Sequence, residues 1–169
     1  MNRLTLILLV TLIFTISGLA QSSIKVGSAA PAFSGTSLDG TSYDLSELRG
    51  SVVVLTFWST RCAICQHELP KLNRIAGAHD PKKVVFLALS MENEGLISNY
   101  LQRNPFRFQA LPNSFGVVLQ YADRDRSGNI DMGFPSFFVI DRQGLVQYRS
   151  SGYDKTEPIN DAIGKLLSK

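Results

Sequence analysis

The chain has 169 residues, of which 44% are hydrophobic and 18% charged, and its formal net charge is +3 at pH 7. These proportions are those of an ordinary globular protein and exclude an intrinsically disordered chain. No run of basic residues is present, so nothing in the sequence supports binding to nucleic acid. The length suits one domain with its own hydrophobic core.

The first 20 residues have the three parts of a secretory signal peptide. Arg3 gives a basic start, residues 4–16 are almost wholly apolar, and small residues precede a cleavage point after Ala20. The apolar run is shorter than the roughly 20 residues that span a membrane. We predict a signal peptide over residues 1–20 and one domain over residues 21–169, with an uncleaved N-terminal anchor as the alternative. Export would place the chain in the periplasm or another extracytoplasmic, oxidising compartment.

The segment that follows is predicted to be irregular at first and then to form a hairpin. Residues 26–33 have the composition of an extended lead-in. Residues 38–44 contain Asp39-Gly40 followed by β-prone residues, which is typical of a hairpin turn. Residues 45–50 are predicted to form one short helical turn that ends at a glycine.

A buried strand and an amphipathic helix come next. Residues 52–57 are an unbroken apolar and β-branched run, which predicts a strand buried on both faces. Residues 66–76 have apolar side chains at three- and four-residue spacing, which predicts a helix. Cys62 and Cys65 lie between them, so Cys62 is expected at or near the N-terminus of this helix.

The two cysteines are the only ones in the chain, and their position suits redox chemistry. Free N–H groups and the helix dipole favour a thiolate at Cys62, and Arg61 adds a positive charge beside it. We therefore expect an exposed, acidic Cys62 that attacks a disulfide and a shielded Cys65 that resolves the product. The alternatives are a structural disulfide, which would close a very short loop, and half of a zinc site completed by His67 and His79.

The rest of the chain alternates strands with helices. Strands are predicted over residues 83–90, 106–111, 136–141 and 145–150, the last two joined by a turn and antiparallel. Helices are predicted over residues 95–102, 115–121 and 157–167, with Thr156 as N-cap of the last. This order favours an α/β fold with a mixed central sheet.

Residues 123–131 imitate the start of a calcium-binding EF-hand loop. The twelfth position, however, is Phe134 and not glutamate, and the arginines in the segment oppose a cation. We interpret the segment as a charged surface loop.

Together these features resemble the thioredoxin superfamily, and within it the TlpA/ResA-like exported thiol–disulfide oxidoreductases. Trp58 precedes the cysteine pair at the family's spacing, and Pro70 lies in the active-site helix. Residues 133–141 resemble the family's cis-proline strand, with Pro135 as the cis-proline. Residues 27–50 resemble the N-terminal extension of TlpA-like and peroxiredoxin-like proteins. The resemblance implies a thioredoxin-like fold, a central mixed sheet flanked by helices and preceded by this extension.

The resemblance also implies a function. It implies an enzyme without cofactor or metal that exchanges disulfides with protein clients, more as a reductant than as an oxidant. A membrane-embedded electron donor and a monomeric state are implied as well. Cys62 would be the nucleophile and Cys65 the resolving thiol, and four residues would shape the site: Trp58, Arg61, Phe134 and Pro135. Pro135 would place the Phe134 backbone beside the cysteines, where it can pair with a substrate strand.

The sequence departs from the family's pattern at three places. Arg61 stands where tryptophan is usual, and residues 63–64 lack the proline that often precedes the second cysteine. Thr56 occupies the place of the buried aspartate of classical thioredoxin, so a base for Cys65 must come from elsewhere. A glutamate after the next strand is the candidate, either Glu92 or Glu94; both could instead be solvated loop carboxylates.

Two other functions compete with this interpretation. A peroxidase of the peroxiredoxin type needs proline seven residues and Thr or Ser three residues before its cysteine; Ser59 fits, but Leu55 does not. A metal-binding module, such as a copper chaperone, wants a histidine opposite the pair and usually a wider cysteine spacing.

Overall fold

The computed structural model describes residues 23–168. The predicted signal peptide lies outside the described residues, so its cleavage and the domain boundary after Ala20 stay predictions. Within residues 23–168, no helix has the length and apolar character needed to cross a membrane.

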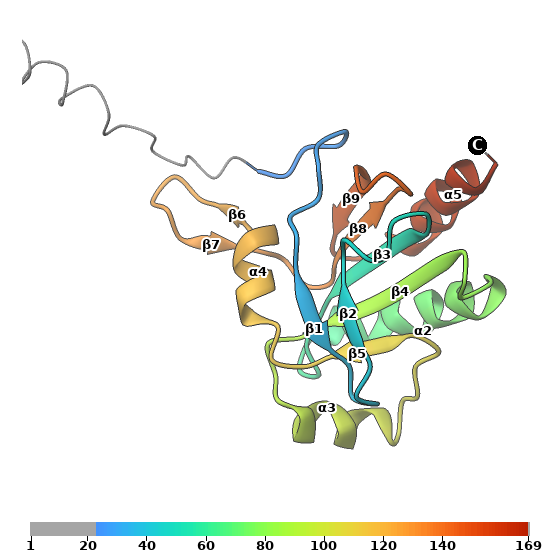
Figure 1. Cartoon of the computed structure of the whole chain (residues 1–169). Coiled ribbons are helices and arrows are strands. Elements are labelled where there is room, and N and C mark those ends of the chain that lie inside the picture. Colours follow the sequence, from blue (N-terminus) through green and yellow to red (C-terminus); the bar gives the residue numbers. More distant parts are fainter. Residues whose placement is uncertain (1–22, 169) are drawn as a thin grey trace, which may run out of the picture.

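A five-stranded mixed sheet forms the centre of the molecule, with strand order β5-β4-β3-β8-β9 (Figure 1). The central strand β3 (Val52–Phe57) runs parallel to β4 (Val84–Leu89), which pairs in parallel with β5 (Gln109–Leu111). On its other side β3 pairs antiparallel with β8 (Ser136–Ile140), and β8 pairs antiparallel with β9 (Val146–Ser151). The predicted α/β fold with a mixed sheet is therefore confirmed.

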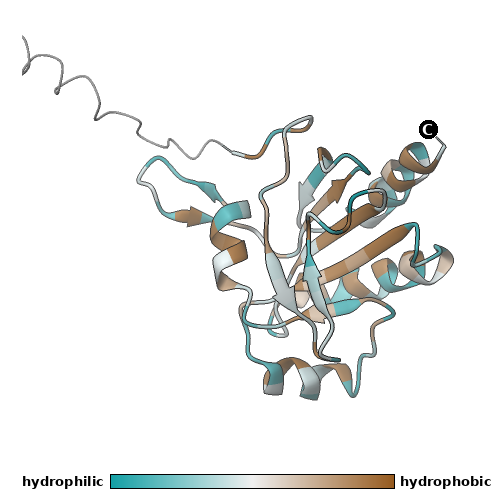
Figure 2. Ribbon diagram, in the orientation of Figure 1, coloured by the Kyte–Doolittle hydropathy of each residue, from teal (hydrophilic) through white to brown (hydrophobic). Residues whose placement is uncertain are grey.

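Both faces of the sheet are covered, which explains the unbroken apolar sequence of β3. Val52 and Val54 face α2 (Ala63–Ala78) and α5 (Thr156–Leu167), while the alternate residues of the strand face the opposite layer (Figure 1). All six residues of β3 are buried. The hydropathy colouring in Figure 2 shows the same contrast, with apolar central strands and mixed helices. Burial of a Val or Leu side chain contributes about 1.5–3 kcal/mol, so this strand anchors the fold.

The N-terminal segment and α4 (Phe115–Tyr121) form the second layer. Strands β1 (Ser34–Thr36) and β2 (Ser42–Asp44) make the predicted hairpin, and Gly40 at its turn has a φ of +84° that favours glycine. Residues 45–50 form a series of turns and not a helix. Phe33 and Leu45 pack into the same apolar cluster as α4.

Several element boundaries differ from those that the sequence predicts. Helix α2 begins three residues earlier than expected, and β5 covers only the last three residues of the strand predicted over 106–111. Helix α3 (Glu94–Leu101) is capped by Asn93, whose side chain accepts from the Leu96 N–H. The prediction of Thr156 as N-cap of the last helix is wrong: Lys155 is the cap residue, and Thr156 is the first residue of α5.

The predicted surface loop at 123–131 is a short hairpin of β6 (Asp123–Arg124) and β7 (Ile130–Asp131). Asp125 accepts hydrogen bonds from the backbone N–H groups of Ser127 and Asn129 inside its own turn. This carboxylate therefore stabilises the turn, as in other tight turns that contain aspartate.

Candidate active site

The cysteine pair lies where β3 leads into α2. Cys62 is the N-cap of α2, and the N–H of Cys65 donates to its Sγ at 3.0 Å. The two residues form a disulfide, with their Cα atoms 5.1 Å apart. The pair therefore occupies a helix N-terminus, where unpaired N–H groups and the helix dipole stabilise a thiolate.

The two sulfur positions differ in access to solvent. Cys62 is partly exposed, whereas Cys65 is 0% exposed and belongs to the main apolar cluster. Between them, Ala63 and Ile64 are exposed, and Ile64 keeps 41% of its surface accessible. This asymmetry is the one that attack by one sulfur and resolution by the other require.

The segment before β8 lies against Cys62. The Phe134–Pro135 peptide bond is cis, and the carbonyl oxygen of Phe134 lies 3.5 Å from Cys62 Sγ. Phe134 and Cys62 line one cavity of about 290 Å³. Its remaining lining residues come from the loops after β3 and β4: Trp58, Ser59, Arg61, Ser90, Met91 and Glu92.

Trp58 is a core residue behind the pair. Its side chain is fully buried, and its ring centroid lies 5.3 Å from that of Tyr100 and 5.1 Å from that of Phe106. Its Nε1 has no hydrogen-bond partner among the described residues. Trp58 therefore supports the loop that leads to Cys62 mainly by packing.

The structure separates the two glutamates proposed as acid or base. Glu92 lines the cavity with Cys62, and its carboxylate accepts hydrogen bonds from Ser59, Thr60 and Ser90. Burial alone would raise the pKa of Glu92, but these hydrogen bonds outweigh it and hold the pKa below its usual range. Glu94 is exposed in the first turn of α3 and does not line the cavity.

A third carboxylate, Glu68, was missed by the sequence reasoning. Its side chain is 0% exposed and accepts from Lys71 Nζ at 2.8 Å and from the Lys155 N–H at 3.3 Å. Burial would raise its pKa, but these bonds and those from His67 and the Asp154 backbone keep the pKa below its usual value. The available signal was its spacing, three residues after the buried Cys65 on the apolar face of the helix.

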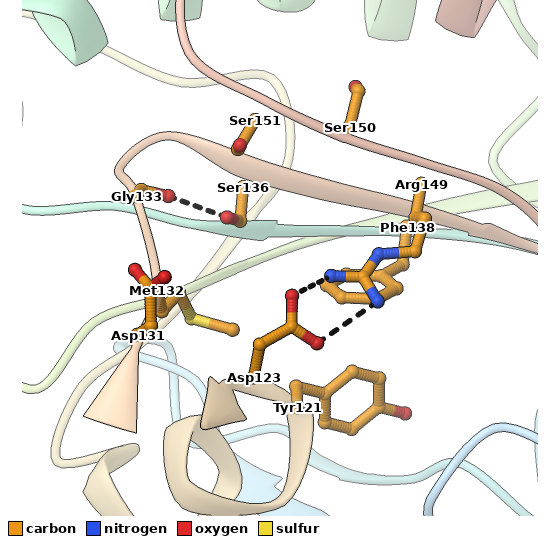
Figure 3. A pocket seen from close by; sticks show the side chains of 10 residues that line it. All are labelled: Tyr121, Asp123, Asp131, Met132, Gly133, Ser136, Phe138, Arg149, Ser150 and Ser151. Atoms are coloured by element: carbon orange, nitrogen blue, oxygen red, sulfur yellow. Dashed lines mark hydrogen bonds and ion pairs between the residues drawn. The ribbon is translucent and has the colours of Figure 1, made fainter. Parts of the chain in front are cut away.

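A second cavity, of about 150 Å³, lies beside the segment that leads to the cis-proline and is drawn in Figure 3. Contacts between the residues that line this cavity hold the segment in place. Arg149 of β9 forms an ion pair with Asp123 of β6, with Nη2 and Oδ2 2.6 Å apart. The Ser136 hydroxyl donates to the Gly133 carbonyl oxygen just before the cis bond. These contacts join the β6–β7 hairpin to the sheet edge and fix the approach to Phe134.

The two histidines lie too far apart to complete a metal site together with the cysteines. His67, in the first turns of α2, stacks on Tyr153 with 4.6 Å between ring centroids. His79 is the C-cap at the other end of this 16-residue helix, roughly 18 Å from His67 along the helix axis. Among residues 23–168, no group of three or more His, Cys, Asp or Glu side chains is gathered as a metal site would need.

Comparisons with known proteins agree on one family. A family model described as Redoxin matches residues 25–166. The chain is 30% identical over 140 residues to the thiol-disulfide oxidoreductase ResA of Geobacillus kaustophilus, covering 82% of this chain and 76% of that one. It is 25% identical over 147 residues to the ResA of Bacillus thuringiensis, and the match covers 86% of this chain and 81% of that one. A Chlorobium tepidum crystal structure assigned as the thiol:disulfide interchange protein DsbE superposes with a TM-score of 0.69 and 25% identity. The superposition covers 86% of this chain and 99% of that one.

Proposed function

The chain belongs to the Redoxin family, and we propose that it is an exported thiol–disulfide oxidoreductase that reduces disulfides in protein clients through Cys62 and Cys65. The disulfide between a partly exposed Cys62 and a fully buried Cys65 is the observation that carries this proposal. Relatives that bear the name thiol-disulfide oxidoreductase along most of the chain support it.

In the reaction, the Cys62 thiolate attacks one sulfur of a client disulfide. A Cys62–client bond forms, the client disulfide breaks, and one client sulfur leaves as a thiolate. Cys65 then loses its proton and attacks Cys62, which releases the second client thiolate and forms the Cys62–Cys65 disulfide. The client gains two electrons that the pair loses, so a donor must reduce the pair again; a membrane-embedded donor fits an exported enzyme.

The cis-proline segment supports a role in docking the client. The Phe134 carbonyl lies beside Cys62, so an extended client strand has a backbone acceptor to pair with at the point of attack, whereas Pro135 has no N–H to donate. Arg61 and Trp58 would shape the same surface, the first by charge and the second by packing. We propose that the enzyme acts as a monomer at this site.

The peroxidase alternative has less support. Ser59, the residue at the position that a peroxidase needs, donates its hydroxyl to Glu92 at 3.0 Å, and Leu55 is buried in the middle of β3. Consumption of hydrogen peroxide by the reduced protein would contradict the proposal of a disulfide reductase.

The test is to trap the mixed disulfide. Cys65→Ala should accumulate Cys62–client adducts, seen on non-reducing gels, whereas Cys62→Ala should accumulate none. Equal capture by both variants would contradict the assignment of the nucleophile. The reduction potential of the wild-type pair tests the direction of electron flow. A value of about −270 mV supports a reductant, and one of about −120 mV supports an oxidant.

A further inference from the structure

Glu92 lies beside the cysteine pair because two parallel strands end at the same edge of the sheet. Phe57 of β3 is in register with Leu89 of β4, and the Trp58 N–H donates to the Leu89 carbonyl at 3.1 Å. The segments that follow, 58–61 and 90–92, therefore leave the sheet side by side. The first of them leads directly to Cys62.

The carboxylate of Glu92 joins these two segments. Its Oε2 accepts from the Thr60 N–H at 2.8 Å and from the Ser90 hydroxyl at 3.2 Å. Its Oε1 accepts from the hydroxyls of Ser59 at 3.0 Å and Thr60 at 2.8 Å. The Ser90 N–H is itself bound to the Leu111 carbonyl of β5, so the carboxylate is held on a rigid base.

The residues that Glu92 holds are those that place the start of α2. The Cys62 N–H donates to the Ser59 carbonyl at 3.2 Å, and the Gln66 side chain donates to the Thr60 carbonyl at 3.0 Å. The turn at Ser59 and Thr60 therefore sets where Cys62 sits relative to the first turn of the helix. Movement of this turn would move the nucleophile.

All four donors to Glu92 are neutral, since they are three hydroxyls and one backbone N–H. Among residues 23–168 no lysine, arginine or histidine forms an ion pair with Glu92. Because the bonds also hold its pKa low, the carboxylate is ionised at neutral pH and its charge is not cancelled. Among the described residues, Glu92 and Arg61 are the two charged ones that line the cavity with Cys62.

We propose that Glu92 is a positioning residue that holds the turn before Cys62 and whose fixed negative charge opposes the Cys62 thiolate. This inference rests on the proposed function. Reduction of the pair takes up two electrons and two protons and gives two thiols, and ionisation of Cys62 then stabilises the reduced form. A charge that disfavours the thiolate favours the disulfide, so electrons pass more readily from the pair to a client.

The test compares carboxylate and amide at position 92 in the full chain. Glu92→Gln keeps the size of the side chain and one carbonyl acceptor for the Thr60 N–H, but removes the charge. In the reduced protein, the pKa of Cys62, followed by thiolate absorbance, should fall by about half a unit to one unit. The equilibrium of disulfide and two glutathione thiols with dithiol and glutathione disulfide should shift about two- to fivefold toward the dithiol.

Two matched variants separate charge from shape. Glu94→Gln removes a charge of the same kind two residues away, on an exposed helix end, and should leave both readouts at wild-type values. Glu92→Asp keeps the charge on a shorter arm and should keep the Cys62 pKa closer to wild type than Glu92→Gln does. If Glu92→Gln titrates and equilibrates like Glu94→Gln, the proposal is overturned. Failure of the wild-type pair to exchange with glutathione would instead contradict the proposed function, while the titration would still decide the role of Glu92.

Discussion

Two carboxylates flank the cysteine pair, and they are kept ionised in different ways. Glu68, one turn after Cys65 in α2, is fully buried and accepts from the cation of Lys71 and from His67. Glu92, on the loop beside Cys62, accepts only from neutral donors within the part of the chain that the structure describes. The charge of Glu68 is compensated by the Lys71 cation, whereas the charge of Glu92 faces the cavity that Cys62 lines. We therefore expect Glu68 to matter most for stability and Glu92 most for the thiol chemistry.

The largest expected effect is the loss of stability on removal of Glu68. Glu68→Ala should lower the free energy of unfolding by about 2–4 kcal/mol, because Lys71 loses a buried partner and the Lys155 N–H loses its acceptor. Urea unfolding of the oxidised protein measures this difference. Asp154→Ala is the control: Asp154 also pairs with Lys71, but it is 68% exposed, so the change should stay below about 1 kcal/mol. Equal losses in the two variants would show that burial of Glu68 is not the cause.

Acid should weaken the fold through both carboxylates. Their pKa values in the folded protein lie below the usual value of 4.5, so their contribution is complete above that pH and is lost as the pH falls through the lower folded values. Wild-type stability should therefore decline from about pH 5 downward. Glu68→Gln and Glu92→Gln should each flatten this decline, measured as the thermal midpoint at a series of pH values. Curves parallel to wild type would contradict the lowered pKa values of these residues.

A smaller effect is expected from the donors that hold Glu92. Thr60→Val removes the hydroxyl that donates to Oε1 but keeps the backbone N–H, so it should destabilise the protein by about 0.5–1.5 kcal/mol. Thr60→Ser keeps the hydroxyl and should recover most of the loss. Urea unfolding again gives the measurement, and equal losses in both variants would contradict the assignment of the effect to the hydroxyl bond.

The fold could be predicted from the sequence because its strongest patterns are local. The apolar run at 52–57 and the spacing at 66–76 both give the correct element, and the cysteines then fall at the turn between them. Short elements were less accurate: β5 keeps only the last three predicted residues, because pairing with β4, and not composition, sets where the strand begins. Threonine is a residue type that is common at N-caps, but the hydroxyl of Thr156 makes a tertiary contact instead and lies 3.5 Å from Glu68 Oε2.

The site was predictable only in part for the same reason. The cysteine spacing and the proline at 135 are visible in the chain, whereas two of the partners of Glu68, Lys155 and Thr156 at the start of α5, lie 87 and 88 residues away. Similarly, the choice between Glu92 and Glu94 depends on which side chain turns toward the loop after β3. One is fixed by Ser59 and Thr60, while the other begins a helix on the surface.

The smallest expected effect concerns Arg61, the other charge that lines the cavity. Its guanidinium makes no hydrogen bond within the described residues and the residue is exposed, so solvent and salt screen its charge more than that of Glu92. Arg61→Trp should raise the pKa of Cys62, because the thiolate loses a cation, but by less than about half a unit. Titration of the thiolate absorbance at low salt measures the change.

Arg61→Gln separates the charge from the aromatic surface, since both variants remove the cation and only one adds a ring. If charge is the cause, both should raise the Cys62 pKa equally, and the shift should shrink at high salt because exposed charges are screened. The shift in the Cys62 pKa should have the opposite sign to the shift caused by Glu92→Gln. It should also be smaller, because four hydrogen bonds fix the Glu92 carboxylate and none fixes the Arg61 guanidinium among the described residues. Titration curves that match wild type in both variants would leave Arg61 a role only in docking of the client, where its charge meets the client and not the thiolate.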